Sequence, residues 1–351
     1  MELMYRRLEG EEIREGFLRN YEADFDITTD VDNPTNDFEI QMDMPETTYD
    51  LLWKENEISC IVYVDGTEWG GLITGAEMSL ADSRITYTGV TWRGLLSLYI
   101  IEPYILGQTP QDYKIVASGT NLAEALRALP MHPMISIQDT SYTAGRQFQY
   151  NRYIPVHEGA TNLVKDYDTS LRMKFAFDEA TLKAKLSIAP TTDRTNLIEI
   201  SQDYDDKVRL SITRDGSTPK HVICMGQGEL AQRDIVHLYA DDDWNVSTTA
   251  ISGAYPVDTY DYSGSESLQT DGIKHFRELI AQHEQIEVMV SGIELNLGDI
   301  IAAREILTGE YVTAEITKIV WKCHDFGTYQ TDSFEYTTAV KTRTVESGGK
   351  A

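Results

Sequence analysis

Alternation of apolar and polar residues with a period of two is the feature that most limits what this chain can fold into. It is clearest over 37–43, and it returns over 57–64 and 84–92. Such alternation puts successive side chains on opposite faces of a strand, so it predicts half-buried β-strands. Asp65-Gly66 favours a tight hairpin turn, and Gly70-Gly71 predicts a bend or bulge that curls a sheet. The first hundred residues therefore predict an antiparallel meander.

The middle of the chain predicts a small α+β module. Asn121 has the position of an N-terminal cap, because an apolar pattern at helical spacing follows it until Pro130. The predicted elements are a helix over 121–129, a helix over 161–171, and a hairpin of 172–177 with 183–188.

A second β region follows from about 205. Its predicted strands are 208–213, 221–224, 234–239, 286–290, 311–321 and 331–338. A Gly/Ser/Tyr/Asp-rich segment over 241–270 predicts a loop, and the apolar stripe that begins near Asp271 predicts one helix. The order is therefore β, then α+β, then β with an inserted helix.

Charge and cysteine usage exclude several classes of protein. Asp and Glu total 57 against 30 for Lys and Arg, a net charge of −27, which argues against a nucleic-acid clamp or a binder of anionic membranes. A hydrophobic fraction of 41% predicts a folded chain in spite of that charge. Three widely spaced cysteines predict neither a disulfide framework nor a zinc ribbon. We also expect no signal peptide and no membrane span.

Motifs that carry chemistry are incomplete. His283-Glu284 opens an H-E-x-x-H pattern, but Glu287 stands where the second histidine belongs. Gly226-Gln227-Gly228 lacks the third glycine and the Lys-Ser/Thr of a phosphate loop, and the seven histidines are scattered. A carboxylate pair for glycoside hydrolysis stays possible, since 57 acids always supply one at a workable distance. We predict no enzyme, with no catalytic residue, no cofactor and no metal ligand.

Three stretches in order carry a family resemblance. They are 88–98 with Trp92, Arg93 and Gly94, 222–230 with Gly226 and Gly228, and 297–305 with Gly298 and Asp299. Together they resemble the tail-hub proteins of siphovirus-type bacteriophages, which are related to the baseplate hubs of contractile tails and to bacterial injection machines. The resemblance covers about 18–340 and so nearly the whole chain.

The resemblance implies a mainly β fold with α+β, made of two tail-tube-like antiparallel β-barrel domains and a smaller α+β module. The implied boundaries are 1–102 for the first barrel, 103–204 for the module, 205–340 for the second barrel with an inserted loop and helix over 241–285, and 341–351 for a flexible tail. It also implies a homotrimeric ring that adapts a sixfold tail tube to a threefold tail tip.

The same resemblance implies partners and a place. Distal tail or tube proteins would bind one face of the ring, and tail-tip, fibre or lytic proteins would bind the other. DNA would pass without specific binding, because an acidic wall repels phosphates. The protein would belong to the tail tip of the virion and be assembled in the host cytoplasm.

Structural roles are implied for the seven motif residues. Gly226, Gly228 and Gly298 would let the backbone bend, while Trp92 and Arg93 are either an interface or an ordinary strand-end aromatic with a solvated arginine. A carbohydrate-binding or glycan-degrading β protein is the alternative function, because Tyr outnumbers Phe 20 to 9. A tail-tip peptidase is a weaker third hypothesis.

Overall fold

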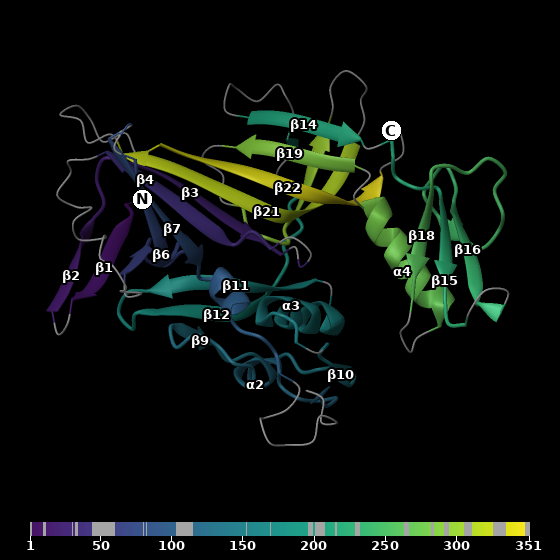
Figure 1. The fold of residues 1–351 in the computed structure, drawn as a ribbon, viewed down its shortest axis with the longest axis horizontal. Helices are drawn as coiled ribbons and strands as arrows, with labels where there is room; N and C mark the ends of the chain where they lie inside the picture. The colour runs from purple at the N-terminus through teal and green to yellow at the C-terminus, as the bar shows by residue number, and fades with distance from the viewer. Residues whose placement is uncertain are drawn as a thin grey trace. The chain divides into compact units, whose positions relative to one another are not determined.

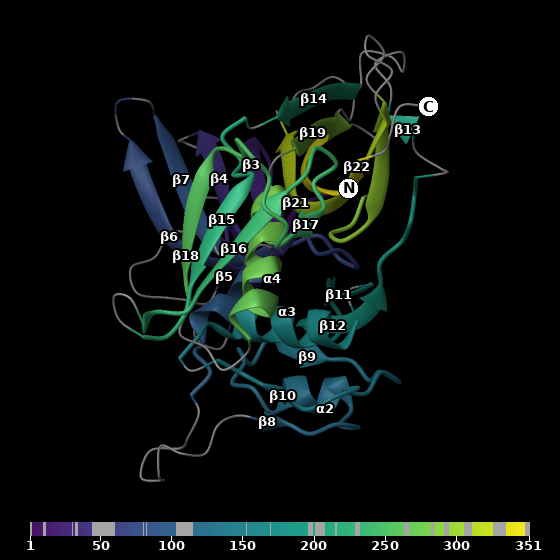
Figure 2. The ribbon, with the colours of Figure 1, turned by 90° about the vertical axis from the view of Figure 1, so that its right-hand side faces the viewer.

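The chain is mainly β with few helices, as predicted (Figure 1, Figure 2). Its structure is a computed structural model, which describes residues 2–9, 12–29, 31, 34–43, 60–79, 81, 83–102, 115–151, 153–168, 170–195, 199–200, 208–214, 216–228, 232–262, 267–281, 284–290, 295–304, 311–325 and 335–347. It divides into two compact units, which are Met1–Thr192 with Val290–Asp299 and Thr317–Val340, and Asp193–Met289 with Ile300–Ile316 and Lys341–Ala351. Each unit is described by itself.

The first unit holds an antiparallel sheet in the order β21-β3-β4-β7-β6-β5-β1-β2. Its strands are β1 (Met4–Glu9), β2 (Glu12–Phe17), β3 (Tyr21–Thr28), β4 (Asp37–Asp43), β5 (Cys60–Tyr63), β6 (Gly70–Ser79), β7 (Arg84–Thr91) and part of β21 (Tyr311–Asp325). Burial alternates along β3, β4 and β7, which is the predicted period of two. Aromatic rings fill the buried face, where Phe25 lies 5.0 Å from Phe38 and 5.4 Å from Trp321 between ring centroids.

The α+β module also belongs to the first unit. Its elements are η1 (Gly94–Leu98), β8 (Ile115–Val116), α2 (Leu122–Arg127), β9 (Ile135–Ile137), β10 (Phe148–Gln149), α3 (Val156–Tyr167), β11 (Leu171–Asp178) and β12 (Lys183–Pro190). The predicted cap is confirmed, since the Asn121 side chain accepts a hydrogen bond from Ala123 N at 2.9 Å. The predicted β11–β12 hairpin is confirmed as well.

The second predicted helix, 161–171, was misplaced: α3 begins at Val156 and ends at Tyr167. Pro155 directly precedes the helix, and its ring fixes φ at −56°, a value that is compatible with the start of a helix. Gly159 favours helix poorly, but its missing Cβ leaves room for Ile101, so packing extends the helix through it. The helix ends before Asp168. The carboxylate of Asp168 accepts a hydrogen bond from Ser170 N (2.8 Å), which forms a local turn in place of a further helical turn.

Two turn predictions for the meander need correction. β5 ends at Tyr63 and β6 begins at Gly70, so Asp65-Gly66 is not a two-residue hairpin. Gly66 N instead donates to Phe177 O at 2.9 Å, which holds the turn against β11. The sheet has its register shift between Ile73 and Gly75, further along β6 than the paired glycines. Gly71 lets the backbones of β6 and β7 come close together, because a Cβ there would lie 2.0 Å from Val90 O.

The second unit has a four-stranded sheet in the order β17-β16-β15-β18. The unit's elements, some shared at their ends with the first unit, are β13 (Glu199–Ile200), β14 (Val208–Arg214), β15 (His221–Met225), β16 (Ile235–Ala240), β17 (Val246–Ser247), β18 (Val257–Asp261), α4 (Leu268–Ala281), β19 (Glu284–Val290), β20 (Ile300–Arg304), part of β21 and part of β22 (Glu335–Ser347). Helix α4 packs on one face of this sheet, where Phe276 is buried against Val222, Cys224 and Leu238.

Three expectations for this part of the chain are corrected. The segment 241–270 is not only a loop, because it supplies β17 and β18, and β18 pairs in parallel with β15. Helix α4 begins at Leu268 rather than near Asp271, since the Ser267 hydroxyl accepts from Thr270 N (3.2 Å) as a cap does. β22 continues to Ser347, into the segment predicted as a flexible tail.

The predicted domain boundaries, and the closure of each β region into a barrel, stay predictions. The two compact units divide the chain differently, since the first unit combines the module with strands from both ends of the sequence. None of the helices that the structure describes is long and apolar enough to span a bilayer.

Candidate functional site

Trp92 directly follows the strand β7 and lies in the core of the first unit. Its side chain is fully buried and stacks on Phe177, with ring centroids 4.7 Å apart and planes 12° apart. The chain then enters η1, where Leu95 and Leu96 are also fully buried. The predicted strand that ends in a short helix with a Leu-Leu pair is confirmed. Trp92 is therefore a packing residue between β7 and β11, with no surface left for another protein.

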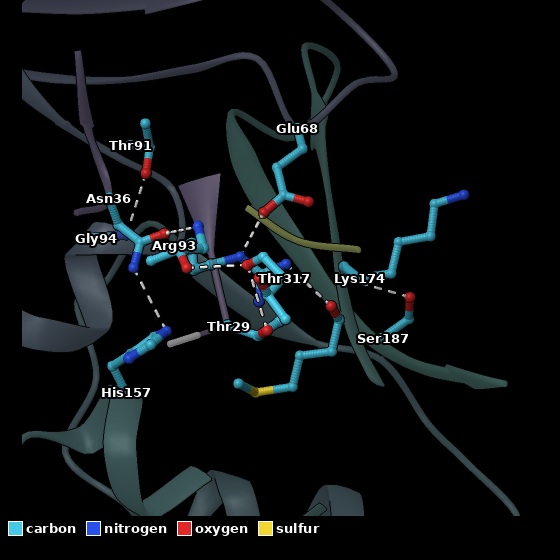
Figure 3. A network of polar contacts seen from close by, with 12 residues as sticks. Thr29, Asn36, Glu68, Thr91, Arg93, Gly94, His157, Lys174, Ser187 and Thr317 are labelled. Atoms are coloured by element: carbon cyan, nitrogen blue, oxygen red, sulfur yellow. Dashed lines mark hydrogen bonds and ion pairs between the residues drawn. The ribbon is translucent and has the colours of Figure 1, made fainter. Parts of the chain in front are cut away.

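Arg93 is buried and fully engaged (Figure 3). Only 1% of it is exposed, its Nε donates to Glu68 Oε1 at 2.8 Å, and its Nη2 donates to Met173 O at 3.0 Å. Its guanidinium also lies 5.0 Å from the Phe175 ring centroid. The interpretation as a solvated arginine was wrong, because the carboxylate, the carbonyl and the ring replace water around the charge.

Gly94 is required by its neighbour Asn36, which Figure 3 shows beside it. A Cβ at Gly94 would lie 2.1 Å from Asn36 O, a contact that only glycine avoids. Asn36 is buried, and its Oδ1 accepts from Thr28 N at 2.8 Å while its backbone O accepts from Thr91 N at 3.1 Å. Its Nδ2 is 3.4 Å from His157 Nε2 on α3. Asn36 thus joins β3, β7 and α3, and no motif in the sequence points to it.

Asp299 forms a second buried junction in the same unit. It is 0% exposed and forms an ion pair with Arg172 of β11. Thr192 N donates to it at 3.2 Å and Asn296 N at 3.3 Å, while Arg172 Nη1 also donates to Leu297 O at 2.9 Å. Gly298 has a φ of +80°, so the turn before Asp299 needs the freedom of glycine. The turn 295–299 is thereby fixed to β11.

Strand β11 is contacted at two places, by Trp92 with Arg93 and by Asp299. Trp92 and Arg93 reach it through Phe177, Phe175 and Met173 O, and Asp299 reaches it through Arg172. Two of the three family stretches therefore meet on one strand of the module, although they are about two hundred residues apart in sequence. Arg172 was missed as a site residue because it reads as an ordinary charge at a strand start.

Gly226 and Gly228 lie in the second unit, at the return from β15 to β16. Gly228 has a φ of +101°, and a Cβ there would lie 2.4 Å from Gln232 O. Gly226 N donates to Asp234 O at 2.8 Å, and its carbonyl accepts from Arg233 Nε at 3.0 Å. These bonds join described residues at the two ends of the return, and Gly228 has the positive φ that favours glycine, whereas Gly226 does not.

The described residues contain no group of three or more His, Cys, Asp or Glu side chains arranged to hold a metal ion. Helix α4 ends at Ala281 and Glu284 begins β19, so the incomplete H-E-x-x-H does not continue the helix, and His283 itself lies outside the described residues. Several tyrosines are core residues, namely Tyr5, Tyr21, Tyr63, Tyr87 and Tyr150. The carbohydrate alternative stays a prediction for a glycan array to test.

The three cysteine thiols are expected to be unreactive in the folded protein. All three are free and buried, and burial raises the pKa of Cys60 to about 12 and also raises the pKa of Cys224 and Cys323. The thiolate is the reactive form, so a thiol reagent at mildly alkaline pH should modify none of them before denaturation and all three after it. Because the folded state disfavours the thiolates, stability should fall as the pH rises above about 9. Rapid labelling of the native protein would contradict this.

Comparison with known proteins gives matches among solved structures. Neither a protein-family model nor a curated protein matches the sequence. A tail protein from Neisseria meningitidis is 11% identical, with a TM-score of 0.57 over 97% of this chain and 96% of its own. The 43 kDa tail protein of prophage MuSo2 from Shewanella oneidensis is 12% identical, with a TM-score of 0.60 over 97% and 98%. This chain has the fold of prophage tail proteins.

A third tail protein extends the likeness to another bacterium. It is gp18 from Listeria monocytogenes, 10% identical, with a TM-score of 0.51 over 99% of this chain and 96% of its own. The resemblance found in three short stretches is thus confirmed for the fold of the whole chain.

Proposed function

We propose that this protein is the structural hub of a phage tail, a homotrimeric ring that adapts a sixfold tail tube to a threefold tail tip and forms part of the DNA conduit. The observation that carries the proposal is the prophage tail fold, which extends over 97% of the chain and 96% or more of the matching chains. The hub acts through geometry rather than chemistry. Tube proteins bind one face, and tail-tip, fibre or lytic proteins bind the other.

The buried junctions on β11 support a role as a rigid connector. An adaptor must keep the angle between its parts while neighbours bind to it. Ionic and hydrogen-bonded groups with fixed geometry hold a single packing arrangement better than aliphatic contacts alone when all partners are satisfied. Arg93 is bonded in this way at one place on β11. At the other, Asp299 is bonded to Arg172 and to Thr192 N, while Arg172 Nε has no hydrogen-bond partner among the described residues.

The polar face of the first unit's sheet supports the conduit. Asp24 on β3 lies directly opposite Glu39 on β4, and both are exposed. Like charges in register destabilise a sheet, so this pair favours a role for the negative face beyond folding. Three cations offset part of the charge of this face: Lys322 pairs with Asp24 (2.6 Å), Lys318 with Asp26 (2.6 Å) and Arg84 with Asp43 (3.2 Å). The pKa of Asp37 on the same face is raised, mainly because the carboxyl is partly buried and also because the negative charge of Asp26 is near. A face of this kind repels DNA phosphates.

The first test is the assembled tail itself. Imaging tails that contain this chain should show three copies in a ring between tube and tip, and mass measurement of the purified ring should give a trimer. A chain that stays monomeric and is missing from the tail would contradict the hub.

Labelling tests which face lines the conduit. Glu39→Cys should react in assembled tails with a small maleimide but not with a bulky polymer-linked one, because a lumen admits only the small reagent. The native cysteines are buried and leave little background. In the free protein, Glu39→Cys and the control Asp139→Cys, whose side chain is 93% exposed, should react with both reagents. Reaction of assembled Glu39→Cys with the bulky reagent would place this face outside the conduit.

A further inference from the structure

Two histidines meet on the exposed face of the second unit's four-stranded sheet. His221 on β15 and His237 on β16 are 16 positions apart in sequence, so they read as scattered. The antiparallel register pairs His221 with Tyr239 and Ile223 with His237, which makes the two histidines diagonal neighbours. The opposite face of the sheet is covered by α4 and carries Val222, Cys224 and Leu238. Both imidazoles are therefore on the side away from that core.

The facing nitrogen atoms are within coordinating distance of one another. His221 Nε2 lies 2.9 Å from His237 Nδ1, and the two rings are 27° from parallel with centroids 5.1 Å apart. Tyr239 stacks on His221 at 4.3 Å and 13°, which restricts rotation of that ring. Zinc or copper bonds to imidazole nitrogen are about 2.0–2.1 Å long, so two such bonds at octahedral or tetrahedral angles place the nitrogens about 2.8–3.4 Å apart. The His237 ring is exposed, so it can turn to direct its Nδ1 lone pair at an ion that lies off the line between the two nitrogens.

We propose that His221 Nε2 and His237 Nδ1 form a binding site for one divalent transition-metal ion, with water completing the coordination. The two rings now share one hydrogen bond. When the ion binds, the donor ring carries its proton on its other nitrogen, so both facing nitrogens present lone pairs and no proton leaves the pair. Tyr239 is a positioning residue that holds the His221 ring.

The placement of the two rings, fixed by the strand register and by the stacking of Tyr239, favours a metal over an ordinary surface hydrogen bond. Neutral imidazole is the form that binds metal, and the 2.9 Å contact between the facing nitrogens needs a lone pair on at least one of them. No third His, Cys, Asp or Glu joins the pair among the described residues, so affinity depends on both rings. The Irving–Williams order predicts Cu²⁺ before Ni²⁺ and Zn²⁺. The site lies outside the buried junctions and goes beyond the hub function.

Calorimetric titration of the full chain with Cu²⁺ and with Ni²⁺ tests the site. We expect one equivalent bound, with affinity at least about tenfold lower in His221→Gln and in His237→Gln, because losing one ring removes the chelate. His275→Gln is the matched control, since His275 stacks on Tyr260 of the same unit, and it should leave the affinity unchanged. Electron paramagnetic resonance of the copper complex should show two nitrogen ligands.

A second readout separates the site from adventitious binding. Saturating Cu²⁺ should raise the melting temperature of the wild-type chain but not of the His221→Gln/His237→Gln variant, because only the former binds the ion in its folded state. The inference is overturned if the wild-type chain shows no saturable binding of one equivalent, or if the double variant binds copper as well as the wild type does.

Discussion

Replacing Asp299 with alanine is expected to lower the free energy of unfolding by about 3–5 kcal/mol, the usual cost of leaving one member of a buried ion pair alone. Asp299 is 0% exposed and its partner Arg172 is 9% exposed, so water cannot replace the lost carboxylate. The change also removes the acceptor for Thr192 N and Asn296 N. Urea denaturation followed by tryptophan fluorescence measures the effect, since Trp69, Trp92 and Trp321 all belong to the first unit.

An exposed ion pair is the matched control for this experiment. Arg127 and Asp139 are paired on the surface of the same unit, with side chains 43% and 93% exposed, so Asp139→Ala should cost no more than about 1 kcal/mol. A double change, Arg172→Met with Asp299→Leu, should recover part of the stability because it removes both charges. If Asp299→Ala and Asp139→Ala destabilise equally, the junction does not hold the fold.

Period-two alternation predicted most of the strands because it follows from burial on one face. Strands β4, β7, β15 and β16 lie within a residue or two of their predicted positions. The helix of α2 was predicted because its cap and its apolar stripe are both local signals. The start of α3 was missed, since Gly159 is tolerated there only through packing against Ile101, which is distant in sequence.

The candidate site was predictable only in part, and for a similar reason. Trp92, Arg93 and Asp299 were singled out by the family resemblance, but their partners Glu68, Arg172 and Met173 O carry no sequence signal. Whether Arg93 is solvated depends on what β11 brings to it, and pairing between distant segments decides that. The His221–His237 pair shows the same limit, because the β15–β16 register joins two histidines that the sequence leaves apart.

Gly94→Ala is expected to destabilise the first unit by about 3 kcal/mol, the upper end of the usual cost of overpacking. Alanine favours helical backbone by up to about 1 kcal/mol over glycine, so helix propensity alone predicts a stabilised η1. The clash dominates, because the new Cβ would lie 2.1 Å from the backbone oxygen of Asn36, and that backbone is held by Thr91 N. A backbone atom held by a hydrogen bond directly before β4 cannot move aside as a flexible side chain can.

The sign of this effect separates steric need from propensity. Gly145→Ala is the control, since a Cβ there meets nothing within 4 Å, and it should change stability by no more than about 0.5 kcal/mol. Thermal and urea unfolding of both variants against the wild type measure the difference. A Gly94→Ala protein as stable as Gly145→Ala would mean that the junction between η1 and Asn36 yields, and a connector that yields there could not keep β7, α3 and the sheet at fixed angles within a tail hub.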